Sequence, residues 1–181
     1  MVPKRMIGAK LIPLNKLKTK QEKLYNEYAK KYYDHPERVK LLERRIPKLN
    51  CLWNDVNHFL PLHPSHVYNA LKEIGINVKD DIKFYKIPVL NLEYNKNAIY
   101  LYNKDNYNGP AAEMQSEEIH LIDIKEYEEL PSIPPDTINY YKEEHRKGNR
   151  FGMFPFIPHI LSLGEVKVSN AEIIGWGNDI D

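Results

Sequence analysis

The sequence has little cysteine, little glycine and no long hydrophobic run. Its single cysteine, Cys51, excludes a disulfide within the chain and fits a reducing compartment. Eight glycines against 13 prolines and 13 tyrosines indicate few flexible hinges and many rigid turns. No apolar stretch is long enough for a signal-peptide core or a membrane span. We therefore expect a soluble, cytoplasmic protein with no membrane partner.

The composition is that of a folded protein, but its charge is unevenly distributed. With 42% hydrophobic and 28% charged residues, 181 residues are sufficient for one domain with a buried core. Residues 1–48 contain 14 of the 26 Lys and Arg residues and only 5 of the 25 Asp and Glu residues. This leaves about +9 in the first segment and about −8 in the rest. The division predicts a basic arm that binds an acidic partner or the acidic remainder of the chain.

Residues 1–48 show the pattern of two helices. A capping-box motif at 19–22 predicts a helix start, and tyrosines at helical spacing over 25–32 form its apolar stripe. Pro36 starts a second helix, Pro47 ends it, and its basic residues are expected on the outside. The residues expected to contact a partner from this arm are Lys23, Lys30, Lys31, Arg38 and Arg44.

Residues 49–181 combine helical and strand-like segments and are predicted to form the core domain. One helix begins at Pro64 and ends at Gly75, and another runs from about Asp136 to Gly148. The expected strands cover 49–62, 84–94, 98–102, 119–121 and two segments between 159 and 176, with a hairpin joining 84–94 to 98–102. Because strands follow one another in pairs, the pattern favours an α+β fold, a small antiparallel sheet packed with helices.

Four residues of metal-binding type, Cys51, His58, His63 and His66, lie within a span of sixteen residues. Zinc requires such ligands to converge in a tetrahedral arrangement. If 51–59 is one strand, Cys51 and His58 point to opposite faces of it. His63 is expected to cap the helix that follows. We therefore predict no metal site here.

The stretch from Val56 to Leu62, followed by a short helix that ends at 74–76, resembles the opening strand and helix of ADP-ribosyltransferases. That family pairs a His or Arg on the first strand with a Tyr or Ser on a second strand and a Glu on a later one. The resemblance implies His58, either Tyr100 or Tyr102, and one glutamate. The glutamates open to this role are Glu113, Glu117 and Glu118. The cofactor implied is NAD, held by the first two residues, while the glutamate stabilises an oxocarbenium-like transition state.

A second resemblance concerns metal-dependent nucleases of the PD-(D/E)xK type. Glu165-Val166-Lys167 has the form of the family's strand motif, and Pro135-Asp136 lies upstream of it. In that family two carboxylates hold a divalent ion and the lysine positions or activates the attacking water. Here Asp136 is expected at a helix start and not on a strand, which departs from the family pattern.

Two further segments are unusual in composition. Residues 113–129 contain seven acidic side chains against Lys125 alone, and docking against the basic arm would neutralise them. Residues 148–158 are aromatic, flanked by glycine and ended by proline, and form either a core plug or an exposed contact patch. The plug is the favoured interpretation; the patch would make Arg150, Phe151 and Phe154 partner-binding residues.

The prediction from these observations is a binding or regulatory protein. It would hold a macromolecule through the basic arm, the 148–158 segment or both, and a protein is favoured over a nucleic acid as partner. The alternatives are an enzyme that resembles ADP-ribosyltransferases and uses NAD, and then a metal-dependent nuclease.

Overall fold

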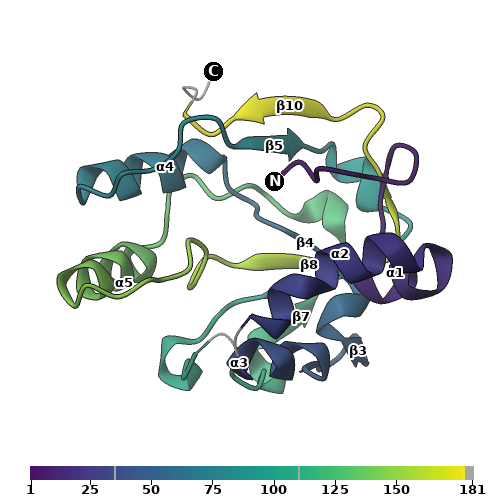
Figure 1. Ribbon diagram of the computed structural model, residues 1–181, viewed down its shortest axis with the longest axis horizontal. Coiled ribbons are helices and arrows are strands. Elements are labelled where there is room, and N and C mark those ends of the chain that lie inside the picture. Colours follow the sequence, from purple (N-terminus) through teal and green to yellow (C-terminus); the bar gives the residue numbers. More distant parts are fainter. Residues whose placement is uncertain (35, 110, 178–181) are drawn as a thin grey trace.

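The computed structural model describes residues 1–34, 36–109 and 111–177 (Figure 1). Within these ranges the chain forms helices and short strands, and every strand pair is antiparallel. The predicted α+β class with small antiparallel sheets is confirmed. No helix in this part of the chain has both the length and the apolar composition needed to cross a membrane.

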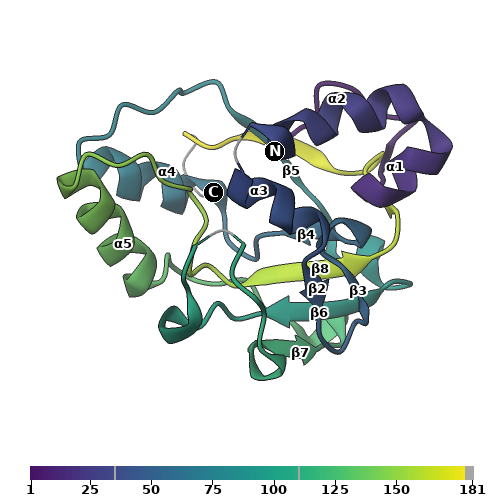
Figure 2. The ribbon, with the colours of Figure 1, turned by 60° about the horizontal axis from the view of Figure 1, so that its bottom comes forward.

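The largest sheet has four strands in the order β4-β8-β6-β7. They are β4 (Asn57–Phe59), β6 (Lys96–Tyr100), β7 (Ile119–Leu121) and β8 (His159–Leu163). Figure 2 shows β8, β6 and β7 side by side. The two central strands are almost wholly buried, including their polar residues Asn97, His159 and Ser162. Strand β4 forms an edge, so one side of it is unpaired within this sheet.

The other strands form three pairs. They are β1 (Lys10–Leu11) with β9 (Val166–Lys167), β2 (Arg45–Ile46) with β3 (Cys51–Leu52), and β5 (Lys83–Lys86) with β10 (Glu172–Gly175). The expected hairpin between 84–94 and 98–102 is therefore wrong. Pro88 ends the extended segment, because it cannot donate to a ladder, and the 3-10 turn η3 (Val89–Leu92) then redirects the chain and buries Leu92.

Helices α4 (Pro64–Glu73) and α5 (Pro135–Arg146) confirm the two helices predicted for the core. His63 caps α4, because its Nδ1 accepts a hydrogen bond from the Ser65 amide at 3.4 Å. Gly148, with φ of 70°, follows α5 as predicted. In Figure 1 the two helices lie at the opposite end of the molecule from the first helices of the chain. Their buried residues join one core cluster that includes Val67, Leu71, Tyr141 and Trp176.

The first helices differ in their boundaries from the prediction. They are α1 (Leu14–Lys20), α2 (Glu22–Tyr33) and the short α3 (Pro36–Val39). The motif at 19–22 does not form a capping box, and α2 begins only at its last residue, Glu22: the Thr19 hydroxyl lies in the last turn of α1 and donates to the Lys16 carbonyl at 3.1 Å. Gln21, with an extended φ of −157°, separates α1 from α2.

The apolar stripe of α1 and α2 packs against the rest of the chain. Leu17, Leu24 and Tyr32 are buried, and the Tyr32 hydroxyl donates to Asn54 Oδ1 at 2.7 Å. The helix expected to continue to Pro47 instead passes through η1 (Lys40–Leu42) into β2, because residues 45 and 46 pair with β3. Arg44, expected on the outside, is 7% exposed, which corrects its assignment to a surface that binds a partner.

Residues 51–59 do not form one strand, which corrects the assumption behind the opposed faces of Cys51 and His58. The chain leaves β3 into the 3-10 turn η2 (Trp53–Asp55) before it enters β4. The Asp55 carboxylate holds this turn, because it accepts hydrogen bonds from the Leu52 amide at 2.7 Å and from Asn15 Nδ2 at 2.8 Å. The remaining 3-10 turns are η4 (Lys104–Asn106), η5 (Ser116–Glu118) and η6 (Ile124–Glu126).

Candidate functional site

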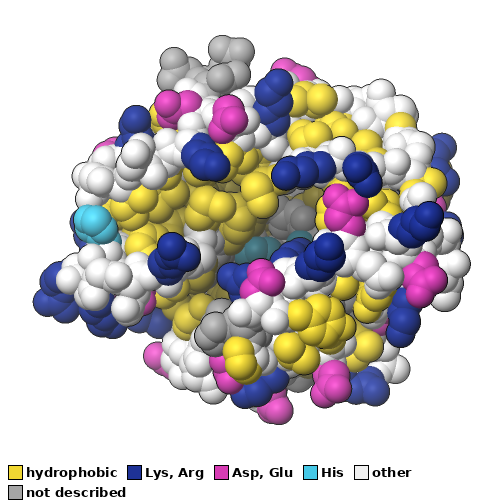
Figure 3. Space-filling view, in the orientation of Figure 1, with side chains coloured by type: hydrophobic (Ala, Val, Ile, Leu, Met, Phe, Trp, Pro, Cys, Tyr) yellow, Lys and Arg dark blue, Asp and Glu magenta, His cyan; other side chains and the backbone are white. Residues whose placement is uncertain are grey.

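A cavity of about 660 Å³ lies between the β5–β10 pair and the free edge of β4. Figure 3 shows its mouth as a hollow near the centre of this face, with hydrophobic side chains on the wall and histidine at depth. Its apolar wall includes Phe59, Leu62, Phe84, Ile87, Ile160 and Ile174. The hollow opens to solvent, and its volume lies within the range of about 300–1,000 Å³ typical of pockets that bind small molecules.

Three histidines line the cavity: His63 at the start of α4, and His58 and His159 on adjacent strands of the main sheet. His58 on β4 lies opposite Leu161 of β8, and His159 lies two residues before Leu161 on the same strand. Because side chains alternate along a strand, His58 and His159 are on the same face as diagonal neighbours. His159 is 8% exposed, whereas His58 is an exposed residue that lines the cavity.

Hydrogen bonds to backbone carbonyls define the tautomer of each ring. His58 Nε2 lies 2.9 Å from the Trp53 carbonyl, and His159 Nδ1 lies 2.7 Å from the Ile157 carbonyl. A carbonyl oxygen only accepts, so these two nitrogens carry the protons. Desolvation by the surrounding protein lowers the pKa of His159 to about 4 and also lowers the pKa of His58. Both rings are neutral at neutral pH, which leaves His58 Nδ1 and His159 Nε2 as acceptors.

A buried cation and aromatic rings surround the histidines. The Trp53 ring centroid is 4.1 Å from that of His58, and the Arg44 guanidinium carbon lies 4.8 Å from the Trp53 ring centroid. Arg44 also donates from Nη2 to the Tyr100 hydroxyl at 3.3 Å. The guanidinium further disfavours a proton on both imidazoles, which lowers each pKa. The sandwich between Trp53 and Tyr100 explains why this arginine is inside the protein.

The structure brings some of the residues predicted for ADP-ribosyl transfer to one sheet. Tyr100 on β6 lies opposite His159, and the Tyr102 ring centroid is 5.1 Å from that of His159. Burial raises the pKa of both tyrosines, so both are neutral at neutral pH. The side chain between His58 and these tyrosines is thus His159, which sequence reasoning did not assign to the site.

Of the three candidate glutamates, only Glu118 lies in this neighbourhood. Its electrostatic effect contributes to the raised pKa of Tyr100 and Tyr102, whereas Glu113 and Glu117 are exposed. Glu118 is 4% exposed, and its two oxygens accept hydrogen bonds from the amides of Asn103 and Gln115, each at 2.8 Å. Its carboxylate thus holds two loops together. ADP-ribosyl transfer with NAD stays a prediction.

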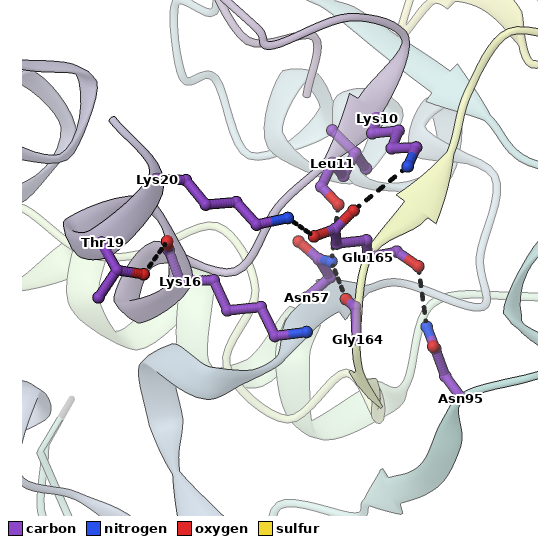
Figure 4. Close-up of polar contacts among 9 residues, drawn as sticks. All are labelled: Lys10, Leu11, Lys16, Thr19, Lys20, Asn57, Asn95, Gly164 and Glu165. Carbon is purple, nitrogen blue, oxygen red and sulfur yellow. Dashed lines mark hydrogen bonds and ion pairs between the residues drawn. The ribbon is translucent and has the colours of Figure 1, made fainter. Parts of the chain in front are cut away.

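The residues of the nuclease resemblance are not brought together. Glu165 forms ion pairs with Lys20 of α1 and, at 3.4 Å, with Lys10 of β1 (Figure 4). Asp136 lies on α5, at the other end of the molecule from α1, and pairs with Lys104 at 3.4 Å. Among the described residues, no group of three His, Cys, Asp or Glu side chains could hold a metal ion.

The 148–158 segment packs largely into the core cluster that includes Tyr141 and Trp176. Phe151 stacks on Tyr141 at a centroid distance of 5.6 Å, Phe156 and Ile157 are buried, and Phe154 lines the cavity. The side chain of Arg150 is exposed. These positions match the core-plug interpretation of this segment.

The basic surface of the N-terminal helices does not dock on the acidic segment. Lys23, Lys30, Lys31 and Arg38 are exposed. Across the described part of the chain, no ion pair joins residues 1–48 to residues 113–129; the pairs formed by the N-terminal segment involve Glu27, Glu37 and Glu165. The acidic segment has its own pair, between Lys125 and Glu93.

Known proteins offer no guide to function. No protein-family model, curated protein or solved structure matches this chain significantly. Function is therefore inferred from the cavity and its lining side chains.

Proposed function

We propose that this protein binds a small, largely apolar molecule in the cavity beside β4. The observation that carries the proposal is the combination of a hollow of about 660 Å³, apolar walls and two neutral imidazoles. Pockets for small molecules typically measure about 300–1,000 Å³ and present a few polar groups on a mostly hydrophobic wall. Perturbed titratable groups that face a pocket are a further mark of such a site.

The walls and the polar groups have separate roles in this proposal. Transfer of apolar ligand surface from water to the wall provides most of the binding free energy, at about 25 cal/mol per Å². The acceptor nitrogens of His58 and His159 orient the ligand, because a ligand donor that meets neither nitrogen loses its hydrogen bonds to water. The main sheet and the turn η2 hold both rings in place.

Replacing Ile174 with tryptophan tests this proposal. The indole would occupy cavity space and remove roughly 60 Å² of apolar contact from the ligand, a loss of about 1.5 kcal/mol. We expect about tenfold weaker binding of the neutral fluorophore N-phenylnaphthylamine, measured by its fluorescence increase. Ile173→Trp is the matched control, because Ile173 is the next residue of β10 and is 55% exposed.

The control should bind the fluorophore as the parent does, and circular dichroism should show that both variants are folded. Absence of saturable binding by the parent protein would refute the proposal. If the parent and both variants bind the fluorophore with equal affinity, the fluorophore binds outside this cavity.

The exposed basic surface of α2 and α3 favours a second candidate function, the binding of an acidic macromolecule. Lys23, Lys30 and Arg38 have no carboxylate partner among the described residues, and a protein partner is favoured over a nucleic acid. Arg44 no longer belongs to this surface, because its guanidinium is buried.

Duplex DNA is a useful probe of this surface, because the salt dependence of binding counts the phosphates neutralised. With three contacts, the logarithm of the affinity should fall with the logarithm of salt at a slope of about −3. We expect weak binding, since the net charge is only +1. The triple variant Lys23→Glu, Lys30→Glu, Arg38→Glu should abolish it in a fluorescence-anisotropy titration. No binding at low salt would remove nucleic acid as a partner.

A further inference from the structure

The cavity carries positive charge at the end near His58. There it meets a smaller hollow of about 280 Å³, and both are lined by Leu11, Lys31, Tyr32 and His58. The charged side chains of the smaller hollow are Arg5, Lys10 and Lys31, and no described carboxylate lines it. The charged side chains that a ligand meets at this end are therefore all cationic.

Lys31 differs from the other two cations in its partners. Arg5 forms an ion pair with Glu27 at 3.3 Å, and Lys10 forms one with Glu165. Among the described residues, no carboxylate lies within ion-pair distance of Lys31, whose ammonium is 5.0 Å from the centroid of the Tyr32 ring. Loss of hydration, and then the charge of Arg38, lowers the pKa of Lys31. An anion beside this ammonium would offset both effects.

We propose that the ligand of the cavity is a carboxylic acid with an apolar body, such as a fatty acid, and that its carboxylate pairs with Lys31. This inference rests on the proposed function and names the class of ligand. The apolar body lies along the walls formed by Phe59, Phe84, Ile160 and Ile174. A single carboxylate matches Lys31, the one cation of the smaller hollow without a carboxylate partner among the described residues, and one ion pair there suffices to orient the chain.

The other charged side chains of the cavity lie outside the smaller hollow. Glu129 lines the main cavity but not the smaller hollow, and it forms no ion pair with Lys31 among the described residues. Lys86 lies on β5 and lines the main cavity but not the smaller hollow, so only Lys31 of the two lies where the hollows meet. The ring of His58 is neutral, and the positive potential of Arg44 behind it favours an anion at this end.

The test compares decanoic acid with decanol, which has the same chain length and no charge. Each is titrated at about pH 7.5, where the acid is ionised, to displace N-phenylnaphthylamine from the parent protein. We expect the acid to bind at least about tenfold more tightly than the alcohol, and Lys31→Met to reduce this ratio to near one. Lys30→Met is the matched control, since it removes the same charge from the adjacent residue of α2, which does not line the cavity.

The possible outcomes separate the two proposals. If the alcohol binds as tightly as the acid, the carboxylate inference is overturned while binding in the cavity stands. If Lys31→Met keeps the preference for the acid, or if Lys30→Met loses it equally, Lys31 is not the anchor. If the fluorophore itself does not bind the parent, the proposed function fails together with the inference.

Discussion

Replacing Trp176 with alanine should lower the free energy of unfolding by about 3–5 kcal/mol. The indole is 1% exposed, and its ring centroid lies 5.5 Å from that of Tyr68 and 6.2 Å from that of Phe84. Its Nε1–H donates to the Lys79 carbonyl at 2.7 Å. The substitution creates a cavity in the core cluster shared by α4, α5 and the β5–β10 pair. Urea denaturation followed by circular dichroism measures the change.

Two further variants separate packing from surface effects at this site. Trp176→Phe keeps an aromatic ring but loses the donor to Lys79, so we expect a smaller loss of about 1–2 kcal/mol. Ile173→Ala on the exposed side of β10 should change stability by no more than about 0.5 kcal/mol. A loss below about 1 kcal/mol in Trp176→Ala would show that this cluster contributes little to folding. The cavity is affected as well, because Phe84 and Ile174 belong to both the cluster and its wall.

Stability should fall by about 3 kcal/mol through His159 alone as the pH drops from about 6.5 to 4. In the unfolded chain this imidazole has its ordinary pKa near 6.5, whereas burial lowers the pKa to about 4 in the folded protein. Between these values the unfolded state binds the proton and the folded state does not. Protons therefore favour unfolding, so the stability is complete above pH 6.5 and is lost on acidification.

The variant His159→Asn isolates this contribution from that of the carboxylates, which protonate in the same range. An asparagine amide can still donate to the Ile157 carbonyl but does not titrate. The free energy of unfolding of the variant should depend less on pH than that of the parent. Between pH 4 and 6.5 its unfolding should take up nearly one proton fewer. His58→Asn should act in the same direction but more weakly, because desolvation lowers the pKa of His58 as well while its side chain is more exposed to solvent than that of His159. Parallel pH profiles for the parent protein and His159→Asn would contradict the buried, neutral state of the ring.

Local sequence signals predicted the elements whose ends carry strong stop and start residues. Helix α4 begins at Pro64 after a histidine cap, and α5 is followed by Gly148. The short strand β7 was also expected, and it is followed by a turn in which the Asp123 carboxylate accepts a hydrogen bond from the Lys125 amide at 3.0 Å. These features depend on contacts within a few residues, which a single sequence shows directly.

Strand pairing could not be predicted, because it depends on residues far apart in the sequence. The segment 83–86 pairs with 172–175, not with the strand that follows it along the chain. Likewise β4 and β6 lie on either side of β8, which is about 100 and 60 residues away, respectively. The hairpin expected from proximity in the sequence was wrong for this reason.

The candidate site was predicted in part. His58, Tyr100 and Tyr102 were named from a resemblance to a family; His58 and Tyr100 lie on strands of the main sheet, and the Tyr102 ring packs on Tyr100 and His159. His159 was missed. The available signal was a histidine directly after Pro158, at the start of a strand whose next two residues are apolar. Arg44 was placed outside because an arginine in a helical pattern is usually solvated. In the folded protein its guanidinium packs on the rings of Trp53 and Tyr100, contacts that the local sequence does not reveal.

The sequence by itself determined the α+β class, the two core helices and the excess of basic residues near the N-terminus, because composition and local periodicity carry this information. Tertiary structure alone decided that an apolar cavity opens beside β4, that His58 and His159 share one face of a sheet, and that Lys31 stands at its positive end. The physical reason is that a cavity is the space between elements. Its shape and charge follow from how distant segments pack.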